Sequence, residues 1–227
     1  MVEVVVVGEG QTEETFVRDV LGPSFAVRNI VLDPRLVRTS TTGRGGALSY
    51  VRVLRYLRNT LRQRADTYVT TFFDLYGIGG DFPGFAEAQS QVDPIARAEV
   101  IESRMHESVV QEAACRADRF FAHIQPYEFE ALLFSDINHL VEIEPDWHGL
   151  ETQLEAVRTA AGTPEHINDG VDTHPAARLV RILRLPRYRK VLHGPRGALR
   201  IGLPRIHGEC RHFATWVEKL ESLRPLV

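Results

Sequence analysis

The feature that most constrains the fold is the opening run of β-branched residues, VVVV at 4–7, which stops at the GEG triplet of residues 8–10. Apolar residues without polar alternation are typical of a strand buried on both faces, as in the parallel sheets of α/β proteins. Thr12 can cap a helix after this strand, because its hydroxyl oxygen accepts hydrogen bonds from free amides of the first turn. We therefore expect a buried strand over residues 2–7 and a helix over about 12–21, ended by the Gly-Pro pair that follows.

Strand-like and helix-like segments alternate through the first part of the chain, which is typical of a mostly parallel sheet with helices on both faces. Pro34 lies in the second expected strand and indicates an edge position or a break, since proline cannot donate to a ladder. Residues 137–227 show only helical patterns, so we predict an α/β domain over 1–136 with a helical extension packed on it. The further expected elements are strands at 30–37, 67–77 and 119–125, helices at 47–64, 94–115 and 128–135, and a loop at 77–93.

Composition excludes several classes of protein. A net charge of −3 and a pI of about 6.3 do not fit a chain that coats nucleic acid, so any such contact must come from a local patch. The glycine-rich loop at 41–46 lacks the lysine of a P-loop, so ATP hydrolysis of that kind is not expected. The distant Cys115 and Cys210 predict two reduced thiols. No signal-peptide pattern and no apolar run of about 20 residues occurs, which predicts a cytoplasmic protein without a transmembrane helix.

Charge is distributed unevenly along the second half of the chain. Between Phe120 and Val157 there is no lysine or arginine, whereas acidic residues are frequent. Between Arg178 and Arg211 the bias reverses, and Glu209 is the only acidic residue. Such runs commonly form solvated helical faces, but they also fit an acidic metal pocket beside a basic phosphate-binding surface.

Carboxylates follow two of the expected strands at the point where each strand ends. Glu9 comes after the first strand between two glycines, and Asp74 comes after the third. Ligands of open parallel sheets bind beyond the carboxyl ends of the strands, so neighbouring strands would bring both side chains into one crevice. Gathered carboxylates repel one another unless a cation lies among them, and such hard oxygen ligands suit Mg²⁺ or Mn²⁺. A polar turn would also explain the glycine-flanked glutamate alone, but the pair favours a metal site for phosphoryl transfer.

The stretch VVVVGEGQTEETFV resembles the start of TOPRIM-type domains, the Mg²⁺-binding fold shared by topoisomerases, primases and OLD-type nucleases. The whole chain resembles a family of uncharacterised bacterial TOPRIM-like proteins, often encoded beside an ABC-type or AAA ATPase in settings that suggest phage defence. The resemblance implies a partner ATPase and a nucleic-acid substrate. It is carried by GEGQTEE (8–14), TTFFDLYGIGGDFPGF (70–85), YEFEALLFSD (127–136), PEHINDGVDTHPAARL (164–179), RYRKVLHG (187–194) and CRHFATWVEKL (210–220).

The resemblance assigns roles to individual positions. Glu9 matches the TOPRIM glutamate that acts as general acid or base, and Asp74 matches the first acid of the metal-binding Asp-x-Asp pair. Tyr76 stands where the second acid belongs, so the pattern departs from the family there. Asp81 in the following loop or Glu130 in the expected helix at 128–135 can replace it as a metal ligand.

Three further expectations concern the surroundings of this site. Glu128, two residues before Glu130, would point elsewhere on a helix. Arg187, Arg189 and Lys190 can contact phosphate, since arginine offers a bidentate fork and lysine a point charge, although a solvated surface explains them as well. Histidines are expected in capping and core positions and not as metal ligands.

Three functions fit these residues. The first is a nuclease or related phosphoryl-transfer enzyme that depends on Mg²⁺ or Mn²⁺, with Glu9 and Asp74 as its catalytic centre and a partner ATPase governing it. The second is a non-catalytic sensor or docking module, in which the broken Asp-x-Asp pair marks lost chemistry. The third is action on a small phosphorylated molecule, which the mild negative charge of the chain permits.

Overall fold

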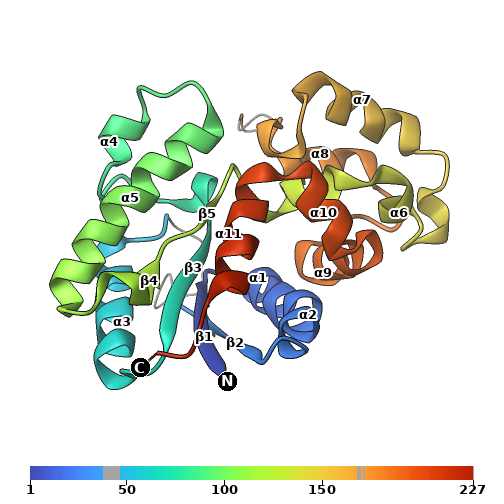
Figure 1. Cartoon of the computed structure of the whole chain (residues 1–227). Helices are drawn as coiled ribbons and strands as arrows, with labels where there is room; N and C mark the ends of the chain where they lie inside the picture. Colours follow the sequence, from blue (N-terminus) through green and yellow to red (C-terminus); the bar gives the residue numbers. More distant parts are fainter. Residues whose placement is uncertain (38–46, 168–169, 171, 227) are drawn as a thin grey trace.

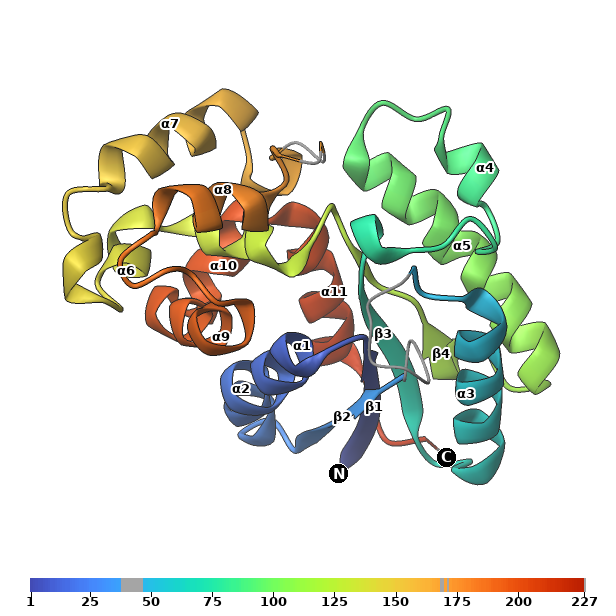
Figure 2. The ribbon, with the colours of Figure 1, turned by 180° about the vertical axis from the view of Figure 1, so that it is seen from behind.

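A computed structural model describes residues 1–37, 47–167, 170 and 172–226 of the chain. The glycine-rich loop expected at 41–46 lies outside the described residues. A sheet and its covering helices form one part of the molecule, and most of the C-terminal helices gather beside them (Figure 1). The same arrangement is seen from behind in Figure 2.

The sheet has five strands, and every pairing within it is parallel. The main path runs β2-β1-β3-β4, and β5 pairs with β3 beyond β4. This confirms the predicted mostly parallel α/β class, and the proline-containing β2 lies at an edge as predicted. The strands are β1 (Val2–Gly8), β2 (Ile30–Leu36), β3 (Tyr68–Asp74), β4 (Phe120–Phe121) and β5 (Ile124–Gln125).

Helices account for most of the remaining described residues, and the part beyond residue 137 is helical as predicted, with no strand among its described residues. Short 3₁₀ helices cover Leu75–Gly77, Ala117–Arg119, Phe129–Ser135, Pro145–Trp147 and Pro164–His166. The α-helices are α1 (Gln11–Phe16), α2 (Gly22–Ala26), α3 (Tyr50–Gln63), α4 (Phe85–Ala88), α5 (Pro94–Ala113), α6 (Ile137–Val141), α7 (Glu151–Ala161), α8 (Pro175–Ile182), α9 (Lys190–Ile201), α10 (Leu203–Glu209) and α11 (Arg211–Ser222).

Successive side chains of β1 enter two separate cores, because neighbouring residues of a strand point to opposite faces of the sheet. Val4 and Val6 pack in the core formed with α1, α2 and α11, and Val5 and Val7 pack in the core formed with α3 and α5. The two sets of helices lie on opposite faces of the sheet (Figure 1). Burial on both faces explains why the strand is a continuous apolar run.

Two expected boundaries are wrong. The first helix does not end before the Gly-Pro pair but continues from α1 through a π-helical turn, Val17–Leu21, into α2. Pro23 is tolerated there because it occupies the first turn of α2, where a missing amide leaves no hydrogen bond unmade. The strand expected at 119–125 is interrupted between β4 and β5, where the Thr71 hydroxyl accepts from the His123 amide at 2.9 Å and donates to its carbonyl at 3.0 Å.

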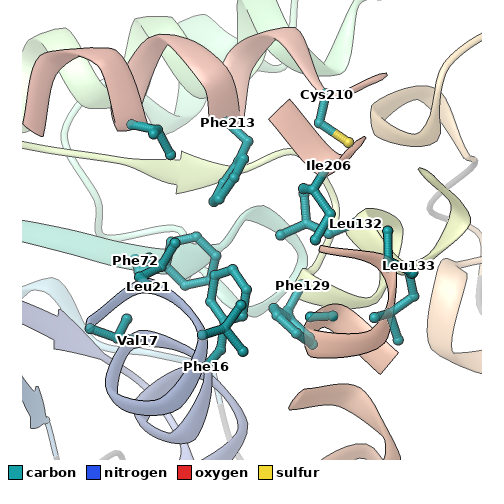
Figure 3. Close-up of a cluster of buried hydrophobic side chains, with 14 of the residues drawn as sticks. Phe16, Val17, Leu21, Phe72, Phe129, Leu132, Leu133, Ile206, Cys210 and Phe213 are labelled. Carbon is teal, nitrogen blue, oxygen red and sulfur yellow. The ribbon is translucent and has the colours of Figure 1, made fainter. Parts of the chain in front are cut away.

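An aromatic core joins the sheet to the helices that follow it in the chain (Figure 3). The ring of Phe16 on α1 lies 5.0 Å from that of Phe129 and 6.0 Å from that of Phe213 on α11, measured between centroids. Phe72 of β3 belongs to the same cluster. The core therefore contains side chains from both sides of residue 136, and the domain boundary expected there stays a prediction.

Buried polar groups fix the position of α11 on this core. The carboxylate of Glu165, fully buried, accepts hydrogen bonds from the amides of His212 and Phe213, each at 2.9 Å. These amides lie in the first turn of α11, where no partner exists within the helix. Glu165 thus acts as an N-terminal cap supplied by a distant segment.

The two cysteines are free thiols, as predicted, and Cys210 is buried against the Ser135 hydroxyl at 3.3 Å. Among the described residues, none of the helices combines the length and the apolar character needed to cross a bilayer.

Replacing Glu165 with alanine should lower the free energy of unfolding by about 2 kcal/mol, because two buried amides lose their acceptor. Urea denaturation measures this loss. Glu218→Ala is the matched control, since this carboxylate lies on α11 with 63% of its side chain exposed and should cost less than about 0.5 kcal/mol. Equal losses in the two variants would contradict the capping role.

Candidate metal centre

The structure brings Glu9 and Asp74 together at the carboxyl edge of the sheet. β1 and β3 are neighbours, with Gly8 paired to Phe72 in register, so the residues that follow them emerge side by side. The backbone amide of Asp74 donates to the Glu9 carboxylate at 3.1 Å. Gly77 passes so close that a Cβ built on it would lie 2.8 Å from a Glu9 oxygen, which explains the glycine at this position.

A second segment supplies two more carboxylates to the same edge. The Phe129 amide donates to the Asp74 carboxylate at 2.8 Å, and the Phe129 ring is buried in the aromatic core. Glu128 and Glu130 flank this anchored residue, with exposed fractions of 2% and 1%. The core that holds Phe129 therefore also holds these two acids beside Asp74.

Lys190, the first residue of α9, joins these two acids. Its ammonium donates to Glu128 at 2.9 Å and to Glu130 at 3.1 Å. The Tyr188 hydroxyl donates to the other oxygen of Glu130 at 3.4 Å. Glu13 of α1 is buried beside them, and its charge acts on both Glu9 and Asp74. These acids, Glu9, Glu13, Asp74, Glu128 and Glu130, are here called the carboxylate cluster. Because 46% of the Lys190 side chain stays exposed, the cluster meets solvent on this side.

Glu128 is further fixed by the start of α8. One of its oxygens accepts from the Ala176 amide and lies 2.8 Å from His174 Nδ1. His174 is the N-cap residue of α8, and the same nitrogen lies 3.4 Å from the Ala177 amide. This confirms a capping role for that histidine.

The donor set fits a hard divalent cation. Carboxylate oxygens of Asp74, Glu128 and Glu130 lie within 4.8 Å of one another. Mg²⁺ binds oxygen at about 2.1 Å in octahedral geometry, which sets its ligand atoms about 3–4 Å apart. Small side-chain adjustments would therefore let these three oxygens share one Mg²⁺ or Mn²⁺, with Lys190 shifting away from one carboxylate.

Burial and crowding make several of these acids hard to ionise. Burial, together with the charge of Glu13, raises the pKa of Glu9 to about 7. Burial raises the pKa of Glu130 to about 7 against the opposing effect of Lys190, with Glu128 adding to the rise. The pKa of Asp74 lies well above its usual range because of burial and the charges of Glu13 and Glu9. Each raised pKa records a carboxylate that lacks a sufficient positive partner.

Glu128 and Lys190 behave in the opposite way. Burial opposes ionisation of Glu128, but Lys190, the Ala176 amide and His174 outweigh it and lower its pKa. Burial alone would lower the pKa of Lys190, but the carboxylates of Glu130 and Glu128 outweigh it and raise the pKa. These two groups are therefore charged near neutral pH, while Glu9 and Glu130 titrate there.

Two expectations about site residues are wrong in position. Glu128 does not point away from Glu130, because it precedes the 3₁₀ helix with extended backbone, φ −161° and ψ 164°, and both side chains reach Lys190. The hydrogen bonds of Asp81 are made to the start of α3 and not to the residues around Asp74. Its carboxylate accepts from the Tyr50 amide at 2.9 Å and the Ser49 hydroxyl at 3.0 Å, which caps α3.

The remaining residues that the sequence indicated lie around this edge. Tyr76 supplies no carboxylate to this edge of the sheet. Its half-exposed ring stacks on His174, with ring centroids 5.1 Å apart. Lys190 contacts the carboxylates instead of standing apart as a phosphate ligand. Arg187 and Arg189 are exposed, and neither forms an ion pair with an acid within the described part of the chain.

A separate group of titratable residues lies where α5, the connection between β4 and β5, and α11 meet. Glu102 accepts from the Ile124 amide at 2.6 Å and lies 2.8 Å from His212 Nε2 and 3.7 Å from His123 Nδ1. Burial lowers the pKa of His123 well below its usual value, whereas Glu102 raises that of His212 against the effect of burial. The hydrogen bonds of Glu102 tie α5, β5 and α11 together, which is a structural role.

Without metal, the free energy of unfolding should decrease as pH rises from about 5 to 8. Glu9 keeps its proton in the folded state up to a pKa of about 7 but loses it near its ordinary value when unfolded, so the folded state is favoured at the lower pH. Glu9→Gln should remove up to about 1.4 kcal/mol per pH unit of this slope, as measured by urea denaturation in EDTA.

Glu14→Gln on α1, the helix that follows Glu9, is the control and should leave the slope unchanged, because Glu14 is partly exposed and outside the carboxylate cluster. Identical slopes for wild type, Glu9→Gln and Glu14→Gln would contradict the raised pKa of Glu9.

Comparison with known proteins gives one match. A family model described as a domain of unknown function (DUF4276) matches residues 8–221. No curated protein and no solved structure matches the chain.

Proposed function

We propose that this chain, which belongs to the DUF4276 family of domains of unknown function, is a metal-dependent phosphoryl-transfer enzyme, most simply a nuclease that hydrolyses phosphodiester bonds. The observation that carries the proposal is the convergence of Glu9, Asp74, Glu128 and Glu130 at the carboxyl edge of a parallel sheet. Ligands of open α/β sheets bind at this edge.

Asp74, Glu128 and Glu130 would hold Mg²⁺ or Mn²⁺. When bound, the ion supplies charge stabilisation at a phosphoryl oxygen. Its charge would also offset the burial and the like charges that raise the pKa values of Asp74 and Glu130. Buried acids with few positive partners are a costly arrangement for stability alone, so this cost supports a functional role.

Glu9 is the residue best suited to move a proton. Its pKa of about 7 places it where a group exchanges protons readily at neutral pH. Its carboxylate is oriented by the Asp74 amide and stays partly exposed, so a substrate can reach it. The role agrees with the general acid or base that the TOPRIM resemblance assigns to this position.

The two carboxylates around Phe129 offer a reason why Tyr76 can stand in place of the second acid of the Asp-x-Asp pair. In this proposal the metal ligands that the TOPRIM pattern takes from one strand end come here from two segments. Arg187 and Arg189, exposed next to Lys190 in the sequence, would contact the polyanion. Control by a partner ATPase in phage defence remains part of the proposal and rests on the resemblance.

A specific observation favours the alternative of a non-catalytic module. Lys190 already compensates Glu128 and Glu130 with hydrogen bonds of 2.9 and 3.1 Å. A cluster stabilised in this way needs no metal to fold, and it would serve a sensor or docking subunit equally well.

Metal-dependent hydrolysis distinguishes the two functions. The wild-type protein with Mn²⁺ should hydrolyse a small diester, bis(p-nitrophenyl) phosphate, and single-stranded oligonucleotides. Asp74→Asn should reduce the rate at least about a hundredfold, because it removes a metal ligand. Asp81→Asn should retain it within about twofold, since asparagine can also cap a helix and Asp81 lies at the start of α3.

Metal should also raise the melting temperature of wild type and Asp81→Asn but not of Asp74→Asn. If Mg²⁺ and Mn²⁺ leave the melting temperature of the wild-type protein unchanged and the protein hydrolyses neither substrate, the non-catalytic alternative is established.

A further inference from the structure

A groove of about 880 Å³ lies between α7 and α8. The two helices are neighbours in both ribbon views (Figures 1 and 2). None of the five acids of the carboxylate cluster lines it. Its size is within the range of pockets that enclose most of a bound small ligand.

The groove combines an apolar floor with basic residues. Leu150 and Val157 contribute to the floor from the α7 side and Ile182 from α8. Leu185, just after α8, is 77% exposed and lies among the residues that line the groove. Three arginines line the groove and one acid, Asp146, opposes them: Arg178, Arg181 and Arg184.

These arginines differ from others in the C-terminal helices. Arg196 pairs with Glu144 at 3.0 Å, and Arg200 pairs with Glu142. By contrast, Arg178, Arg181 and Arg184 form no ion pair with any acid in residues 1–37, 47–167, 170 and 172–226.

The hydrogen bonds of two groove arginines go to backbone carbonyls instead. Arg178 Nε donates to the Thr173 carbonyl at 2.7 Å, and Arg184 Nε donates to the Arg181 carbonyl at 2.8 Å. Burial, with the charge of Arg181, lowers the pKa of Arg178. The groove therefore holds positive charge that the described part of the protein does not neutralise, and an anion would complement it.

The ligand chemistry follows from this pairing of charge with apolar surface. Arginines bind phosphate through bidentate forks, and unstacked bases can also stack on the planes of their guanidinium groups beside apolar side chains. A duplex hides its base faces and would leave the apolar floor unused. Single-stranded nucleic acid offers both phosphates and free bases.

The groove also lies next to the carboxylate cluster, because α8 lines the one and contacts the other. The first turn of α8 binds Glu128 through His174 and the Ala176 amide. With a rise of about 1.5 Å per residue, Arg181 lies about 8 Å along α8 from Ala176, whose amide binds Glu128. A strand held along α8 could place a neighbouring phosphodiester at the acids.

We propose that the groove between α7 and α8 is a binding site for single-stranded nucleic acid, which delivers the strand to the carboxylate cluster. Arg181 and Arg184 contact phosphates, and Ile182 and Leu185 contact bases. The delivery rests on the proposed phosphoryl-transfer function, whereas binding in the groove is measured independently of it.

Fluorescence anisotropy with a labelled single-stranded 12-nucleotide probe in EDTA tests the site. The double variant R181A/R184A should bind at least about tenfold more weakly than wild type. The slope of log affinity against log salt should fall by about 1.4, which is about 0.7 for each lost phosphate contact. The matched control R196A/R200A removes the same charge from α9 and should bind like wild type.

Activity separates this site from the reaction itself. R181A/R184A should hydrolyse bis(p-nitrophenyl) phosphate with Mn²⁺ as fast as wild type, because the small diester does not need the groove, and this also shows that the variant is folded. If wild type hydrolyses nothing, the proposed function fails, while the anisotropy result still decides whether the groove binds.

Three results would overturn the groove proposal. One is unchanged affinity in R181A/R184A, and another is an equal loss in both double variants, which would mean that only overall charge matters. The third is tighter binding of a 12-base-pair duplex than of the single strand, which would assign the surface to duplex nucleic acid.

Discussion

Repulsion among buried carboxylates is the interaction on which the rest of this structure depends. The fold gathers acids from three segments at one sheet edge, and Lys190 reaches only Glu128 and Glu130 with direct hydrogen bonds. Burial, together with the charges of neighbouring acids, raises the pKa values of Glu9 and Asp74. A protein selected for stability alone gains nothing from this arrangement, whereas a cation among the acids would convert the repulsion into binding energy.

The scaffold holds the acids against this repulsion by hydrophobic packing. The parallel pairing of β1 and β3 fixes Glu9 beside Asp74, and the buried Phe129 ring holds the two acids of the second segment. Because Phe129 also packs against Phe16, the aromatic core of Figure 3 fixes the position of the segment that carries Glu128 and Glu130. Changes in that core should therefore alter the carboxylate cluster even where they remove no acid.

Local sequence patterns predicted the parts of the site that depend on strands. Strand-like segments precede both Glu9 and Asp74, and the two side chains meet because β1 and β3 are neighbours, which the sequence pattern left as a condition. The expected helix at 128–135 predicts the wrong direction for Glu128, because this residue precedes a 3₁₀ helix and has extended backbone. The contact of Lys190 with Glu130 spans 60 residues, and no local pattern encodes such a pairing. The resemblance offers Asp81 as a replacement ligand, but its carboxylate binds the Tyr50 amide at the start of α3.

Anomalous X-ray scattering from crystals soaked with Mn²⁺ is the most direct test of a cation among these acids. The account predicts one strong peak bounded by oxygens of Asp74, Glu128 and Glu130, at about 2.2 Å from each, with Lys190 moved away from at least one carboxylate. A map without a peak at this edge, with Lys190 still bound to both acids, would contradict it.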